Sequence, residues 1–116
     1  MAAGFFNALA DPAKAHARSA GTRPADRVHP VVIEAMREAG IDVSGETPQR
    51  LTPELARGVG WLITMGCGDA CPVVPGVARD DWPLDDPAGQ PLDRVRVLRD
   101  EILARVERFL DREQLR

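Results

Sequence analysis

The chain is organised around residues 61–89, WLITMGCGDACPVVPGVARDDWPLDDPAG. This stretch opens on the apolar run Trp61–Met65, which has a glycine on either side and the length of a buried strand. A turn-rich loop follows and holds both cysteines of the protein, Cys67 and Cys71. Because parallel sheets present reactive groups at their carboxyl edge, a strand followed directly by a thiol loop predicts a functional site there.

The end of the same stretch carries a candidate proton donor. Asp85 and Asp86 stand directly before Pro87, and Trp82 lies just upstream. A carboxylate held before a proline, beside an indole that disfavours its charged form, has the properties of a general acid or base. Asp-Pro is equally a common turn, in which the carboxylate only binds backbone N–H groups. The residues alone leave both interpretations open for Asp86.

The two cysteines also allow two interpretations. Three residues separate Cys67 from Cys71, and this spacing fits neither the CxxC of thioredoxin-like proteins nor a zinc knuckle. Structural zinc needs four ligands, and His16 and His29 are far away in the sequence, so we expect no metal site. The pair is then either two small apolar residues in a loop or a redox-active pair in an accessible, glycine-rich loop.

The composition predicts one domain, residues 1–116. Of the residues, 44% are hydrophobic and 28% charged, which is typical of a globular protein. A net charge of −3 without a basic cluster argues against nucleic acid as a partner. No apolar run approaches the roughly 20 residues of a membrane span, and the N-terminal segment lacks the features of a signal peptide. We therefore expect a cytoplasmic protein with reduced thiols and no membrane contact.

Helical periodicity is clearest in residues 91–113, where apolar residues recur every three or four positions. We expect Asp/Glu–Arg pairs three or four residues apart to cover the exposed face of this helix. The other predicted elements are helices at 2–10, from Pro30 to a C-cap at Gly40 and from an N-cap at Thr52, and strands at 17–22 and 60–65. Residues 66–91 are expected to be loop. Alternating strands and helices predict an α/β domain with a parallel sheet.

Three segments together resemble a known family. They are SAGTRP (19–24), HPVVIEAMREAGIDVSGETPQRLT (29–52) and the stretch at 61–89. All three are similar to the arsenate reductases built on the low-molecular-weight tyrosine phosphatase fold, and the CP-x-x-P…W-x-x-DDPAG run is specific for that branch. The resemblance implies a three-layer α/β fold, a parallel sheet with helices on both faces, and an enzyme that reduces arsenate to arsenite in arsenic detoxification.

The resemblance also implies roles for the candidate residues. In that family a cysteine in a CxxxxxR-S/T loop attacks arsenate, an aspartate before a proline acts as general acid, and further thiols complete the reduction. Asp86 matches the general acid, and Cys71 in its Cys-Pro-x-x-Pro context matches the final resolving cysteine. Cys67 lies one position from the other redox cysteine, in a loop shorter than usual. The implied partners are arsenate and a thiol reductant, either a thioredoxin-like protein or a small thiol such as mycothiol, with no bound cofactor.

One part of the family pattern is absent from this sequence. The family's first strand and its CxxxxxR-S/T loop would precede the helix at 2–10, so we expect an N-terminally truncated domain with its first strand missing. Such a chain is expected to be inactive with arsenate on its own. That strand is expected to be central, so its loss exposes sheet edges and predicts self-association or pairing with another chain.

Two other functions follow from the same residues. The first is a non-enzymatic binding or regulatory module that associates with itself or with another chain. The second is a tyrosine phosphatase of the same fold, which is less well supported because Ala88 and Gly89 replace the aromatic residues usual after the acid.

Overall fold

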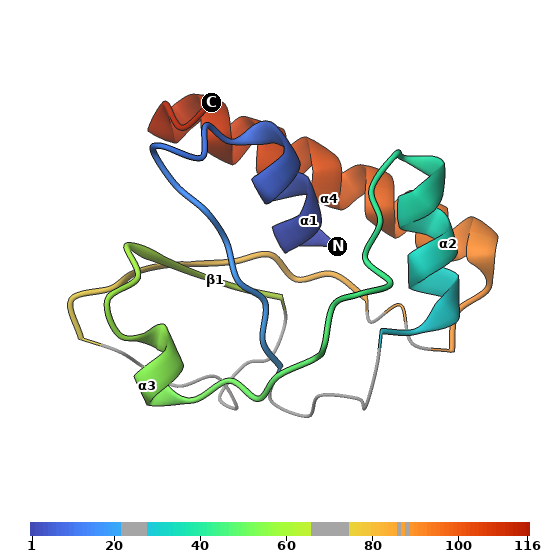
Figure 1. Cartoon of the computed structure of the whole chain (residues 1–116), viewed down its shortest axis with the longest axis horizontal. Coiled ribbons are helices and arrows are strands. Elements are labelled where there is room, and N and C mark those ends of the chain that lie inside the picture. The colour runs from blue at the N-terminus through green and yellow to red at the C-terminus, as the bar shows by residue number, and fades with distance from the viewer. Residues whose placement is uncertain (22–27, 66–74, 86, 88) are drawn as a thin grey trace.

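The computed structural model of the protein describes residues 1–21, 28–65, 75–85, 87 and 89–116. Its elements are, in chain order, α1 (Ala2–Leu9), α2 (Pro30–Glu38), α3 (Pro53–Ala56), β1 (Trp61–Thr64), β2 (Ala78–Asp81) and α4 (Leu92–Glu113) (Figure 1). Within these ranges, no helix combines the length and the apolar character that crossing a membrane requires.

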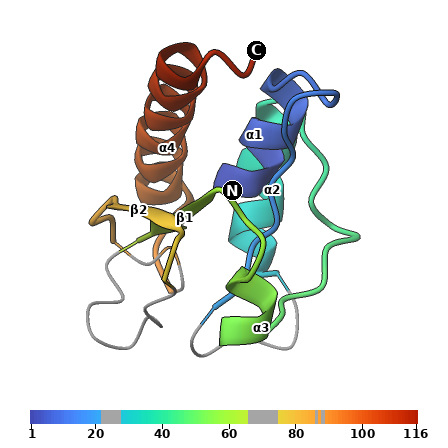
Figure 2. The ribbon, with the colours of Figure 1, turned by 90° about the vertical axis from the view of Figure 1, so that its left-hand side faces the viewer.

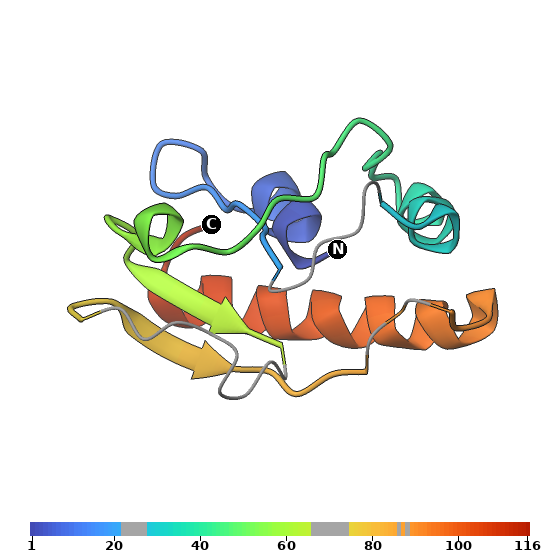
Figure 3. The same cartoon turned by 90° about the horizontal axis from the view of Figure 1, so that it is seen from below.

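The two strands form a parallel pair, which confirms the predicted α/β domain with a parallel sheet (Figure 3). Their register runs from Trp61 opposite Ala78 to Thr64 opposite Asp81. The N–H of Ala78 donates to the carbonyl of Gly60 at 3.2 Å at one end of the pair. The described part of the chain contains these two strands and the single bridge between Gly21 and Arg50.

Two expectations about strands need correction. Residues 66–91 are not loop throughout, because β2 lies inside them. The sequence of β2, ARDD, has no alternation of apolar and polar residues, and it is mostly exposed, so it lacked the signal by which strands are recognised. In the predicted strand at 17–22, the described residues form only the bridge at Gly21, whose N–H donates to the carbonyl of Gln49 at 2.9 Å.

Helix α4 supplies most of the core. Its buried residues recur at helical spacing and are Val95, Leu98, Ile102, Val106, Phe109 and Leu110. Helices α1 and α2 pack against it, one towards each end, while the short α3 lies apart from these three helices (Figures 1 and 2). The sheet packs on the same core, since Phe109 contacts Trp61 and Trp82 edge-on with ring centroids 5.3 and 6.4 Å apart.

The predicted helix ends are confirmed. Pro30 occupies the first turn of α2, and Gly40 follows its C-terminus with φ +83°, a conformation that favours glycine. Thr52 is the N-cap of α3, where its hydroxyl oxygen accepts the N–H of Leu55 at 3.1 Å.

The ion pairs of α4 differ from the prediction. Arg105 and Glu101 form the expected pair four residues apart, at 3.6 Å. Arg96 and Arg99, however, reach across to Glu38 at the end of α2, at 2.6 and 3.0 Å. These arginines therefore fix the position of α2 on α4, in addition to the solvated surface that the sequence predicted.

Candidate functional site

The candidate site is the carboxyl edge of the parallel sheet, where both strands end side by side. Thr64 and Asp81 are the last residues of β1 and β2 and lie opposite each other in the register. The Thr64 side chain is only 4% exposed, and its hydroxyl donates to Oδ1 of Asp81 at 2.6 Å. One residue further on, the N–H of Trp82 donates to the carbonyl of Thr64 at 2.7 Å. These two bonds hold the two strand ends together.

The residues that the sequence predicted as chemical groups, Cys67, Cys71 and Asp86, lie outside the described residues. Their assignment therefore stays a prediction. The described residues around them show how the chain enters and leaves the two loops.

The first acidic residue of the second loop is engaged in an ion pair. The Asp85 carboxylate accepts from Nη2 of Arg94 at 2.7 Å, and both side chains are about half exposed or more. Arg94 lies in the first turn of α4, so this contact ties the loop to the start of the long helix. Sequence reasoning missed Arg94, because a partner nine residues away across a loop follows no helical or strand period. With Asp85 engaged in this way, Asp86 is the better candidate for a proton donor.

Trp82 anchors the same loop in the core. Its side chain is 6% exposed, its ring lies against Phe109, and its indole N–H donates to Oδ2 of Asp80 at 3.2 Å. Trp82 and Asp80 are two residues apart in an extended stretch, so both face α4. The described contacts of Trp82 thus hold the start of the acidic loop, and its predicted neighbour, Asp86, lies outside the described residues.

Together these features define the class of the domain: an α/β domain whose parallel sheet sends two loops from one carboxyl edge, packed against a long C-terminal helix. The chain belongs to the low molecular weight phosphotyrosine protein phosphatase family, whose model matches residues 1–116.

Individual relatives carry a narrower name. The chain is 41% identical over 91 residues to a putative arsenate reductase of Halobacterium salinarum, an alignment that covers 78% of this chain and 64% of that protein. It is 38% identical over 89 residues to an arsenate reductase of Staphylococcus aureus, covering 73% of this chain and 67% of that protein.

A solved structure of an arsenate reductase is also similar to this chain. The thioredoxin-dependent arsenate reductase of Corynebacterium glutamicum superimposes with a TM-score of 0.80 at 33% identity, over 97% of this chain and 54% of that chain. The chain therefore spans between about half and two thirds of the length of these relatives.

Proposed function

We propose that this protein takes part in the thiol-dependent reduction of arsenate to arsenite in the cytoplasm, where thiols stay reduced. The observation that carries the proposal is the paired strand ends at Thr64 and Asp81. In the sequence Cys67 follows the first of these residues by three positions, and Asp86 follows the second by five. The thiol loop and the acid loop therefore start from adjacent points of one sheet edge. The names of the relatives point to the same reaction.

We assign the reaction steps as follows. A thiol attacks arsenate and forms an S–As bond, while Asp86 protonates the oxygen that leaves as water. Cys67 then attacks that sulfur; an S–S bond forms, and the electron pair of the S–As bond stays on arsenic, which leaves as arsenite. Cys71 attacks Cys67 in turn, releases the first thiol and closes a Cys67–Cys71 disulfide. An external reductant returns both cysteines to thiols, so two electrons are balanced per arsenate.

The first step, the attack of a thiol on arsenate, has no assigned residue in this sequence. It holds no CxxxxxR-S/T segment, and its two cysteines are assigned to the later steps. We therefore expect no turnover by the chain alone, and turnover when a thiol is added. The name of the Corynebacterium relative supports a thioredoxin-like reductant, and a small thiol of the mycothiol class is the alternative.

The test measures arsenite formation by the 116-residue protein in three arms: with the thioredoxin system, with a small thiol, and with no reductant. We expect arsenite in at least one thiol arm and none in the third. Asp86→Asn should lower the rate by about 10²- to 10⁴-fold, the usual contribution of a general acid. Cys71→Ser should slow the reaction, because the mixed disulfide at Cys67 is then resolved only by external thiol. Absence of arsenite from all three arms would overturn the proposal.

A second candidate function is that of a non-enzymatic binding module. The carbonyls of Gly60 and Thr64 accept N–H groups from the β2 side, so the backbone groups of Trp61 and Ile63 face the opposite edge of β1. No strand of the described residues pairs with that edge, and an unpaired strand edge is a template for another strand. Failure of the arsenate assay together with self-association would favour this function.

A further inference from the structure

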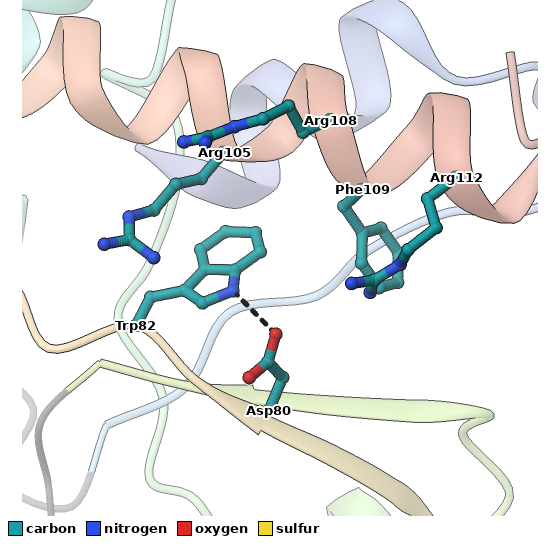
Figure 4. Close-up of a pocket in the computed structure, with 6 residues that line it drawn as sticks. All are labelled: Asp80, Trp82, Arg105, Arg108, Phe109 and Arg112. Atoms are coloured by element: carbon teal, nitrogen blue, oxygen red, sulfur yellow. Dashed lines mark hydrogen bonds between the residues drawn. The ribbon is translucent and has the colours of Figure 1, made fainter.

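A groove of about 480 Å³ lies between the end of β2 and the C-terminal half of α4, next to the candidate site. It is lined by Asp80, Trp82, Arg105, Arg108, Phe109 and Arg112 (Figure 4). Arg94, which marks the candidate site, precedes Arg105 by eleven residues, or about 16 Å along a helix that rises 1.5 Å per residue. The arginine side of the groove therefore lies farther along α4 than Arg94, while Asp80 and Trp82 border the strand ends of the candidate site.

Three arginines of one helical face dominate this groove. Arg105, Arg108 and Arg112 follow each other at intervals of three and four residues, so they project from the same side of α4. Figure 4 shows all three beside the groove, with Arg112 next to Phe109, where its guanidinium carbon lies 5.3 Å from the ring centroid.

Two of these arginines have carboxylate partners, Arg105 with Glu101 at 3.6 Å and Arg112 with Glu113 at 3.2 Å, whereas the third has none among the described residues. Arg108 donates from Nε to the carbonyl of Ala104 in its own helix at 3.3 Å, and no carboxylate of the described residues lies within 4.0 Å of it. Nε of Arg105 is buried, and no acceptor for it exists in the part of the chain that the structure describes. A buried donor without an acceptor is costly, and a movement of the Arg105 side chain towards an anion in the groove would relieve that cost.

The one acidic residue in the lining, Asp80, does not neutralise the arginines. Its Oδ1 accepts the N–H of Asp81 at 2.9 Å, and its Oδ2 accepts the indole N–H of Trp82 at 3.2 Å. The lining thus holds three guanidinium groups and one carboxylate that is already hydrogen-bonded, while Glu101 and Glu113 pair with two of the arginines from outside the lining. The lining residues alone carry a net positive charge, in a protein whose overall charge is −3.

We propose that this groove binds a small polyanion that carries two or more phosphate-type groups. Arginine presents a planar fork of donors that matches the oxygens of such groups. The first and last of the three arginines are seven positions apart, about 10 Å along the helix, which is longer than one tetrahedral oxyanion. A diphosphate or triphosphate spans more of this length than a single phosphate does.

The alternative is that the arginines only complement the negative end of the helix dipole and are solvated. That interpretation predicts weak binding of any anion without saturation, and equal effects of every arginine on the surface. The two interpretations are separated by measuring affinity and by removing individual charges.

The chain carries its own reporter for this measurement. Its two tryptophans are Trp61 and Trp82; Trp82 lines the groove, and Trp61 lies 5.7 Å from the guanidinium carbon of Arg112. Tryptophan fluorescence is followed at constant ionic strength during titration with inorganic phosphate, pyrophosphate and tripolyphosphate. We expect saturation with the two longer anions and at least fivefold weaker binding of phosphate. No saturable change with any of the three would overturn the proposal.

Single substitutions then locate the site. Arg108→Gln should weaken pyrophosphate binding about tenfold, because a charge-assisted hydrogen bond is lost from an exposed side chain that the fold does not need. Arg37→Gln makes the same charge change on the exposed surface of α2 and should alter the affinity less than twofold. Asp80→Asn should strengthen binding, since the repelling charge is gone, although only one of the two hydrogen bonds that Asp80 accepts is retained. Equal effects of Arg108→Gln and Arg37→Gln would show non-specific attraction and contradict the proposal.

Discussion

Glu38 links α2 to α4 through ion pairs with two arginines. Its carboxylate accepts from Arg96 at 2.9 and 2.6 Å and from Arg99 at 3.0 Å, while Arg99 also donates to the carbonyl of Ala35 at 2.8 Å. These hydrogen bonds, that from Arg96 first, lower the pKa of Glu38 from its ordinary value of 4.5 to about 2. Bidentate arginine–carboxylate pairs are the strong form of this interaction.

The lowered pKa makes this pair sensitive to acid. A group whose pKa is lower in the folded state stabilises that state above the ordinary pKa, and the stabilisation is lost as the pH falls towards the folded-state value. We therefore expect Glu38→Gln to lower the melting temperature at pH 6 to 7. The difference from the unmodified protein should shrink between about pH 4.5 and pH 2.

Thermal melts across this pH range check the prediction, and Glu34→Gln is the matched control on the same helix. Glu34 is exposed, and no described arginine or lysine lies within 4.0 Å of its carboxylate. Its substitution should have little effect at any pH. A difference between Glu38→Gln and the unmodified protein that stays constant down to pH 2 would contradict the assignment.

Thr64 is the second residue on which the described site depends. Its buried hydroxyl donates to the Asp81 carboxylate at 2.6 Å. Thr64→Val keeps the shape but removes the donor, so we expect the free energy of unfolding to fall by about 1–3 kcal/mol in urea titrations. Thr64→Ser restores a hydroxyl at the cost of one methyl group and should recover part of the loss. A Thr64→Val variant as stable as the unmodified protein would show that the hydrogen bond contributes nothing.

At the scale of elements, α4 is the part around which the rest packs. Phe109 lies on its inner face, and its ring meets Phe6 of α1, Trp61 of β1 and Trp82 after β2. One side chain therefore joins three segments that are distant in the sequence.

Truncating this ring should destabilise the whole domain. We expect Phe109→Ala to lower the free energy of unfolding by about 3–5 kcal/mol, the usual cost of removing a buried phenyl ring. Val97→Ala is the control on the same helix; its side chain is 54% exposed, and the change should stay within about 0.5 kcal/mol. Chemical unfolding followed by circular dichroism measures both, and similar values for the two variants would contradict the central role of Phe109.

The same elements show which parts of the fold could be predicted from the sequence. The periodicity of residues 91–113 predicted α4 nearly to the residue, and proline and glycine predicted the ends of α2. β2 was not predicted, because an exposed strand of sequence ARDD has no alternation of apolar and polar residues. Two contacts of the site were not predicted for another reason: the ion pair of Asp85 with Arg94 and the hydrogen bond of Thr64 with Asp81. Such contacts depend on which strands are neighbours and on how a loop returns to a helix, and neither leaves a periodic trace.

At the scale of the whole molecule, the described sheet is narrow. β1 pairs with β2 along one edge. The alternation of its hydrogen bonds turns the backbone N–H and carbonyl groups of Trp61 and Ile63 towards the other edge. Trp61 is 36% exposed and Met65, just past the strand, 38%. An exposed edge with large apolar residues favours pairing with another strand, and a charged residue placed on it opposes that pairing.

We therefore expect the protein to self-associate as its concentration rises, and expect Leu62→Lys in β1 to shift it towards the monomer. Light scattering after size-exclusion chromatography measures the mass over a hundredfold range of concentration. Val97→Lys adds the same charge on the exposed face of α4 and should leave association unchanged. Thermal melts confirm that both variants are folded. If the protein is a monomer at every concentration, or if Val97→Lys dissociates it equally well, the edge of β1 is not the contact, and the binding-module function loses the observation that favours it.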